Sequence, residues 1–129
     1  MPIKREKAQR LLAEWVIRLG LTDWHISLHE NCDPDDMTLE GAGEVVYTAV
    51  NKHAVIRIMA KKYHQTPEYY NFEKTLVHEL LHIKMGITFD NLHGVEYDLL
   101  HQNLEDMARA YISAKYGTER YYSGRQATP

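Results

Sequence analysis

The segment 72–85 constrains the fold more than any other part of the chain, because its two sides make opposite demands. It reads FEKTLVHELLHIKM, a helical pattern with Gly86 as its expected end. Its large apolar side chains cluster on one side of a helical wheel: Leu76, Val77, Leu80 and Ile83. His78 and His82 lie about 40° apart on the opposite side. The helix must therefore bury one face in a core and present both imidazoles to a cleft.

The rest of the sequence predicts a small α+β domain around this helix. Residues 3–19 predict a helix ending at Gly20, and three stretches predict strands: 24–30, 43–50 and 53–60. The last two of these strands are expected to be joined by a hairpin turn at Asn51-Lys52. A long amphipathic helix is predicted over residues 94–116, and residues 61–71 and 87–93 are predicted to be connecting segments. We expect helices on one face of a mainly antiparallel three-stranded sheet. Residues 1–117 form the single domain, and 118–129 a polar tail.

Composition narrows the class of protein. The chain has 129 residues, a net charge of −3 and one cysteine, Cys32, so it fits one domain without a disulfide or a cysteine-rich zinc site. The charge argues against nucleic-acid binding, which usually needs a basic face. The N-terminus is charged and the sequence has no long apolar run, so we expect neither a signal peptide nor a membrane helix. We therefore expect a cytoplasmic protein.

The predicted helix 72–85 also carries the residues for metal chemistry. Eight histidines are present in the chain, and His78 and His82 are four residues apart, so they project from one helical face. Two imidazoles so placed can bind one zinc ion, and Glu79 between them can act as general base on a metal-activated water.

The sequence HELLH, at residues 78–82, resembles the zincin metallopeptidases, and more narrowly the small single-domain zincins of phage and bacterial genomes. The resemblance spans residues 24–116. It implies a Zn²⁺ cofactor, His78 and His82 as ligands, Glu79 as base, and a peptide or protein substrate. The chain departs from the metzincin pattern, because Met85 and Thr88 stand where that pattern has glycine and a third histidine. A plain gluzincin signature is absent too.

A catalytic zinc usually has a third protein ligand, which must come from the downstream part of the chain. The candidates are His93, Glu96, His101 and Glu105. On the wheel of the last helix, His101 lies about 60° from the centre of the apolar stripe and Glu105 about 100° away, so the wheel favours His101. In many short zincins the third ligand also lies three residues before an apolar residue and six and seven residues before an apolar-Ala pair. His101 has this spacing to Leu104, Met107 and Ala108, although the ligand in those proteins is often Glu. His93 is the next competitor, because HGVEY at 93–97 resembles an element of SprT-like zincins.

Several other side chains have two readings. The hydroxyls of Tyr47, Tyr63 and Tyr97 are candidate donors to an oxyanion, although packing roles are more common. Four histidines without a helical partner are read as surface or strand residues: His25, His29, His53 and His64. The strand 53–60 is expected to border the cleft and to pair with an extended peptide.

Together these features predict a zinc-dependent metallohydrolase, in particular a peptidase. One alternative is a non-catalytic zinc module with a closed site of four histidines: His78, His82, His93 and His101. A second alternative is a phage accessory interaction domain with an accidental motif. The presence of Glu79 argues against a purely structural site, which needs no base.

Overall fold

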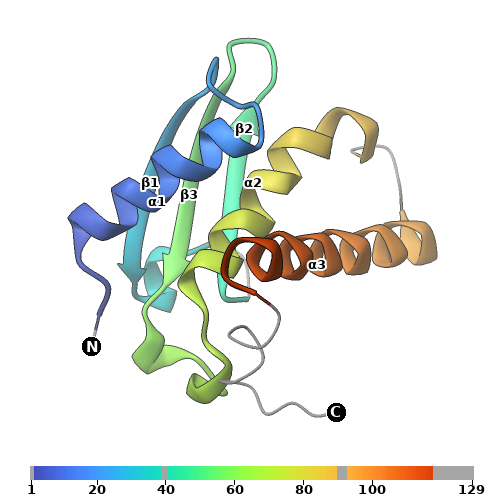
Figure 1. Cartoon of the computed structure of the whole chain (residues 1–129). Coiled ribbons are helices and arrows are strands. Elements are labelled where there is room, and N and C mark those ends of the chain that lie inside the picture. The colour runs from blue at the N-terminus through green and yellow to red at the C-terminus, as the bar shows by residue number, and fades with distance from the viewer. Residues whose placement is uncertain (1, 39–40, 90–92, 118–129) are drawn as a thin grey trace.

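The computed structural model describes residues 2–38, 41–89 and 93–117. Its main elements are α1 (Arg5–Arg18), β1 (His25–Cys32), β2 (Gly43–Thr48), β3 (His53–Met59), α2 (Phe72–Phe89) and α3 (Gly94–Tyr116). Three short 3-10 helices join them: η1 (Pro34–Asp36), η2 (Lys61–Tyr63) and η3 (Pro67–Tyr69). The predicted α+β class and the order of its elements are confirmed (Figure 1). No helix in these ranges has the length and apolar character needed to cross a membrane.

The sheet is mixed, so the prediction of a mainly antiparallel sheet was wrong. Its strand order is β1-β3-β2, with β1 parallel to β3 and β2 antiparallel to β3. The chain leaves β1, crosses to the far edge to form β2, and returns to place β3 in the middle (Figure 1). Alternation of side chains predicts that a strand exists but carries no information on its neighbours.

The position of β3 also overturns the expectation that this strand pairs with a peptide. Both of its edges are used, by β1 and by β2. The hairpin from β2 to β3 turns over residues 49–52, with Lys52 in the left-handed region at φ 55°. The two edge strands of the sheet are therefore β1 and β2, and of these two it is β2 that packs against α2.

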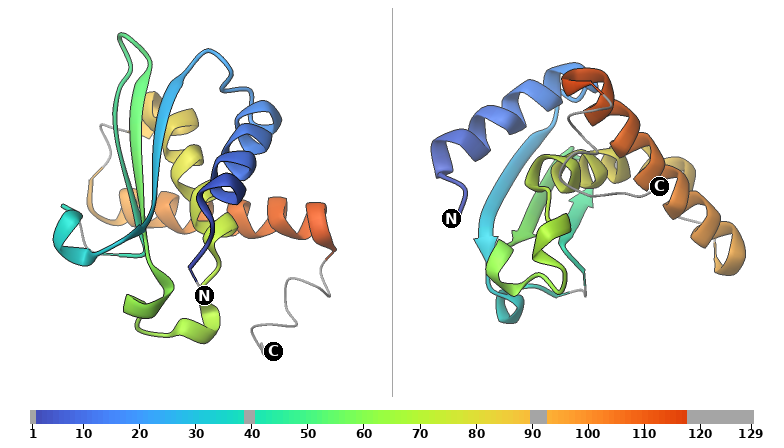
Figure 2. Two further views of the ribbon diagram at one scale, coloured as in Figure 1. Left: turned by 90° about the vertical axis from the view of Figure 1, so that its left-hand side faces the viewer. Right: turned by 60° about the horizontal axis from the view of Figure 1, so that its bottom comes forward.

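The helices α1 and α2 lie on the same side of the sheet (Figure 2). The strand side chains facing them form the core with both helices, and the most buried are Leu28, Ala54, Ile56 and Ile58. The opposite face of β1 exposes His25, Ser27 and His29, as the alternating pattern predicted. Within the described part of the chain, α1 and α2 thus pack on one face of the sheet only.

Contrary to the prediction, α2 does not end at Gly86 but continues to Phe89. A Cβ atom on residue 86 would lie 1.7 Å from the Tyr47 hydroxyl, so glycine is needed for close packing of β2 against the helix. At the other end, the side chain of Asn71 accepts a hydrogen bond of 3.0 Å from the Lys74 backbone N–H and caps the helix.

The last helix, α3, matches the predicted span and ends before Gly117, whose φ is 92°. It buries Leu104, Ala108 and Ile112. Near its C-terminus, Lys115 Nζ donates to Glu73 Oε2 at 2.6 Å, and Trp15 Nε1 donates to the same oxygen at 2.6 Å. This carboxylate is only 8% exposed and joins all three helices, which fixes the position of α3 relative to α2. The predicted tail, 118–129, lies outside the described residues.

Candidate metal centre

Three histidines converge where α3 crosses α2. His78 Nε2 lies 3.2 Å from His82 Nε2 and 3.2 Å from His101 Nε2. One ligand atom from each of the three lies within 4.8 Å of the others, and among the described residues no second group of three or more potential ligands meets this condition. The structure therefore brings together the two helical histidines and the favoured third candidate, in a group that can hold a metal ion.

The spacing suits a tetrahedral ion with nitrogen ligands. Two nitrogens at the usual zinc–nitrogen distance of 2.0–2.1 Å are about 3.3 Å apart in a tetrahedron. The two nitrogen–nitrogen distances at His78 are both 3.2 Å. His78 is buried, His82 half-buried and His101 exposed, so the group is accessible from the side of α3.

Glu105 determines which nitrogen of His78 is available. Its Oε1 lies 2.9 Å from His78 Nδ1. An ionised carboxylate only accepts hydrogen bonds, so Nδ1 must carry the proton and donate it. The lone pair of His78 is then on Nε2, the atom that faces the other two histidines. This carboxylate–histidine arrangement is common behind metal-binding histidines, and it raises the basicity of the ligand.

Lys74 keeps Glu105 ionised. Its ammonium group is bonded to Glu105 Oε2, from the first turn of α2. Burial on its own raises the pKa of Glu105, but the hydrogen bond from His78 and the contact with Lys74 outweigh it and hold the pKa at about 2. The sequence offered Glu105 as a third ligand, whereas the structure places it against the far nitrogen of His78.

The other two histidines are held in the neutral form that a metal needs. Burial, with a smaller contribution from the charges of His78 and His101, lowers the pKa of His82 to about 4. Burial also lowers the pKa of His101, with a contribution from His78. Two of the three imidazoles are therefore held neutral near neutral pH, the form in which histidine binds a cation.

Glu79 is buried beside this group, only 6% exposed. Burial raises the pKa of its carboxyl to about 7, against the opposing influence of His78. The start of β2 lies directly against it, since a Cβ on Gly43 would be 3.2 Å from Glu79 Oε2 and 2.7 Å from Thr75 Cγ2. Glycine at residue 43 therefore lets the edge strand approach the carboxylate, and a pKa near 7 suits a group that exchanges protons at neutral pH.

The remaining ligand candidates lie elsewhere. His93, the residue just before α3, and Glu96, in its first turn, are exposed and do not belong to the group of three. A closed site of four histidines that includes His93 therefore does not form in this arrangement.

The three tyrosines named as candidate donors have different surroundings. Tyr97 stacks on His101, with ring centroids 6.1 Å apart and an interplanar angle of 22°. Tyr47 lies edge-on to Trp24, and its hydroxyl lies against Gly86, one helical turn after His82. Tyr63 instead donates to Asp33 Oδ2 at 2.9 Å. Tyr97 thus contacts one of the three histidines directly, whereas Tyr47 lies against the helical turn that follows His82.

The four other histidines are distributed as surface and strand residues. His25, His29 and His53 are exposed on the sheet, and the rings of His25 and His53 stack at 5.0 Å. His64 is half-buried, and its Nδ1 accepts a hydrogen bond of 3.1 Å from the Thr66 backbone N–H.

Sequence reasoning missed two supporting residues, Lys74 and Gly43. A spacing signal existed for the first: Lys74 precedes His78 by four residues and so shares its helical face. No such signal marks Gly43, whose role depends on how β2 packs on α2.

In comparisons with known proteins, no family model, no curated protein and no solved structure matches this chain.

Proposed function

We propose that the chain is a zinc-dependent hydrolase, in particular a peptidase, with His78, His82 and His101 as metal ligands. The observation that carries the proposal is the convergence of three Nε2 atoms beside a buried carboxylate. A purely structural zinc site uses four protein ligands and has no use for a buried glutamate with a pKa near 7. Three ligands and a base are the parts that metal-assisted hydrolysis requires.

The residues divide the work of hydrolysis between them. Zinc, when bound, supplies a Lewis acid that lowers the pKa of water and polarises a carbonyl. Glu79 takes the proton from the attacking water and delivers it to the leaving amine, for which a pKa of about 7 is well matched. Glu105 holds the proton on Nδ1 of His78 throughout, so that Nε2 stays a ligand.

The edge strand β2 is the natural place for an extended substrate, in the role predicted for β3. Ala42 O accepts a hydrogen bond of 2.9 Å from Met59 N, so its main chain points towards β3. Because such pairs alternate in an antiparallel ladder, the main-chain groups of Gly43 and Val45 point towards the other edge of β2, with which no described strand pairs. A peptide that pairs with this edge passes directly beside Glu79.

Replacing Glu79 by Gln tests the assignment of the base. The wild-type chain and the variant, purified without a metal-affinity tag, are loaded with zinc and incubated with peptides from a denatured protein mixture. We expect about one zinc per chain in both, with cleavage detected by mass spectrometry in the wild type and reduced by roughly 10²–10⁴-fold in the variant. Glu96→Gln, which removes an exposed carboxylate of α3, is the matched control and should cleave normally. Undiminished cleavage by zinc-loaded Glu79→Gln would remove Glu79 as the base.

A further inference from the structure

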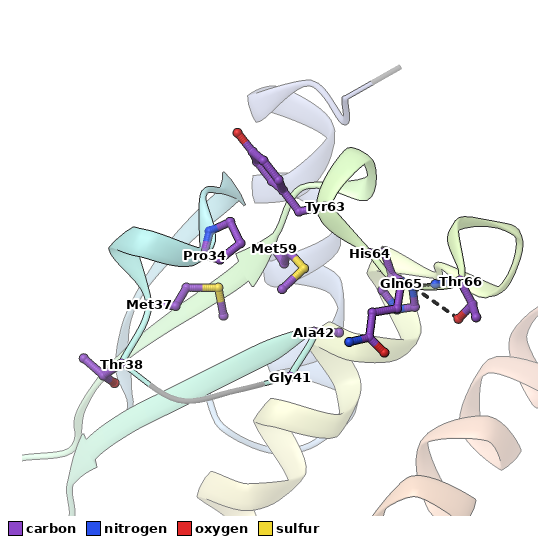
Figure 3. Close-up of a pocket in the computed structure, with 10 residues that line it drawn as sticks. All are labelled: Pro34, Met37, Thr38, Gly41, Ala42, Met59, Tyr63, His64, Gln65 and Thr66. Carbon is purple, nitrogen blue, oxygen red and sulfur yellow. Dashed lines mark hydrogen bonds between the residues drawn. The ribbon is translucent and has the colours of Figure 1, made fainter.

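A cavity of about 820 Å³ lies at the end of the sheet where β2 begins and β3 ends (Figure 3). Its walls come from the connection before β2 and from the segment that follows β3. The apolar lining residues are Pro34, Met37, Ala42, Met59 and Tyr63, and the polar ones include His64, Gln65 and Thr66. Among the lining residues that the structure describes, none is Asp, Glu, Lys or Arg, and this part of the surface is partly apolar.

The walls of this cavity are fixed by hydrogen bonds. Tyr63 donates to Asp33 at 2.9 Å, which ties the segment after β3 to the connection after β1. Tyr70 donates to the Met59 carbonyl oxygen at 2.6 Å and holds the same segment against the end of β3. These bonds hold the segment after β3 in place, and a wall that is held in place lowers the entropic cost of filling the cavity.

One lining residue of the cavity is adjacent in sequence to a residue that lies against the candidate base. Ala42 lines it, and the next residue, Gly43, is the one whose Cβ would lie 3.2 Å from Glu79 Oε2. Successive side chains of an extended strand point to opposite faces of a sheet. Gly43 points towards α2, so Ala42 points to the other face, as does Met59 on β3.

The same alternation applies to a peptide paired with the outer edge of β2. Its residue beside Gly43 points towards Glu79, and the adjacent residue, beside Ala42, points to the face that holds the cavity. We propose that this cavity is a specificity subsite of the proposed peptidase, which takes a large, uncharged, apolar side chain of the substrate one residue from the one beside Glu79. The inference rests on the proposed function and names the substrate class of that site. Two methionines in the lining suit side chains of different shape, from norleucine to phenylalanine.

Binding of defined peptides tests the subsite without any need for turnover. The probes are alanine-rich hexapeptides that carry phenylalanine, norleucine, lysine or only alanine at one central position. Their affinities for zinc-loaded Glu79→Gln protein are measured by calorimetry. Burying one large apolar side chain predicts that the phenylalanine and norleucine peptides bind roughly 10–100-fold more tightly than the other two.

Two further substitutions locate the preference in the cavity. Ala42→Leu narrows it, and Gln65→Trp closes its mouth from an exposed position, so the second variant serves if the first does not fold. Each should reduce the preference to less than about threefold, with zinc content and affinity for the all-alanine peptide unchanged. Ala49→Leu, in the exposed hairpin turn, is the matched control and should keep the preference.

The outcomes separate the subsite from the proposed function. If the wild type cleaves peptides but the preference is absent, or survives in both cavity variants, the subsite is wrong and the hydrolase proposal stands. If the wild type cleaves nothing and the Glu79→Gln protein binds none of the peptides, both proposals fail.

Discussion

Glu105 offers the sharpest test of how the proposed metal centre is built. Its carboxylate accepts a 2.9 Å hydrogen bond from His78 Nδ1, and its side chain is 27% exposed. Glu105→Gln keeps an oxygen near Nδ1 but loses the charge, so we expect zinc affinity to fall about 10-fold. Glu105→Ala removes the acceptor, and we expect a fall of about 100-fold, or about 2.7 kcal/mol. In both variants the stoichiometry should remain one zinc per chain.

Competition with a chromophoric zinc chelator measures these affinities. The control is Asp106→Asn, which changes the same charge at the next residue of α3, where the side chain is 70% exposed. It should bind zinc as the wild type does. An unchanged affinity in Glu105→Ala would refute the supporting role. Loss of the zinc in Glu105→Ala, together with normal binding in His101→Ala, would make Glu105 the ligand instead.

Two further predictions follow from burial and close packing. In the folded, metal-free protein Glu79 keeps its proton up to a pKa of about 7, against an ordinary value of 4.5, so stability falls as the pH rises between these values. Between pH 5 and pH 8 the free energy of unfolding of the wild type, measured by urea denaturation, should therefore drop by about 2–3 kcal/mol relative to that of Glu79→Gln. If the free energies of unfolding of the two proteins depend on pH in the same way, the pKa of Glu79 is not raised by burial. Gly86→Ala forces a methyl group against the Tyr47 ring and should cost about 1–3 kcal/mol in the same assay, and a neutral result would show that α2 and β2 are not in close contact.

The α2 helix and its metal-binding face were predictable because they depend on local periodicity. The spacing of His78 and His82 places them on one face whatever the rest of the chain does. The wheel of the last helix also favoured His101, because a residue at the edge of the buried stripe must face the neighbouring helix. The structure brings all three together, and their role as ligands stays a prediction.

What the sequence could not predict depends on contacts between distant segments. The order β1-β3-β2 follows from the path of the connection after β1, which leaves no periodic signal. The sequence predicts a helix end at Gly86 because glycine often follows the last turn of a helix. In the structure the helix continues, and the absence of a side chain at residue 86 makes room for Tyr47. The sequence leaves Glu105 as an alternative third ligand behind His101, because the wheel gives the direction of a side chain but not the nitrogen of His78 that it meets.

The zinc content of His101→Ala, beside the wild type and His93→Ala, tests the central claim most directly. Each protein is purified without a metal-affinity tag, supplied with zinc, dialysed and analysed by mass spectrometry. The account predicts about one zinc per chain in the wild type and in His93→Ala, whose side chain is exposed and lies outside the group of three. It predicts much less than one in His101→Ala. No zinc in the wild type, or full occupancy in His101→Ala with loss in His93→Ala, would contradict the metal centre described for this chain.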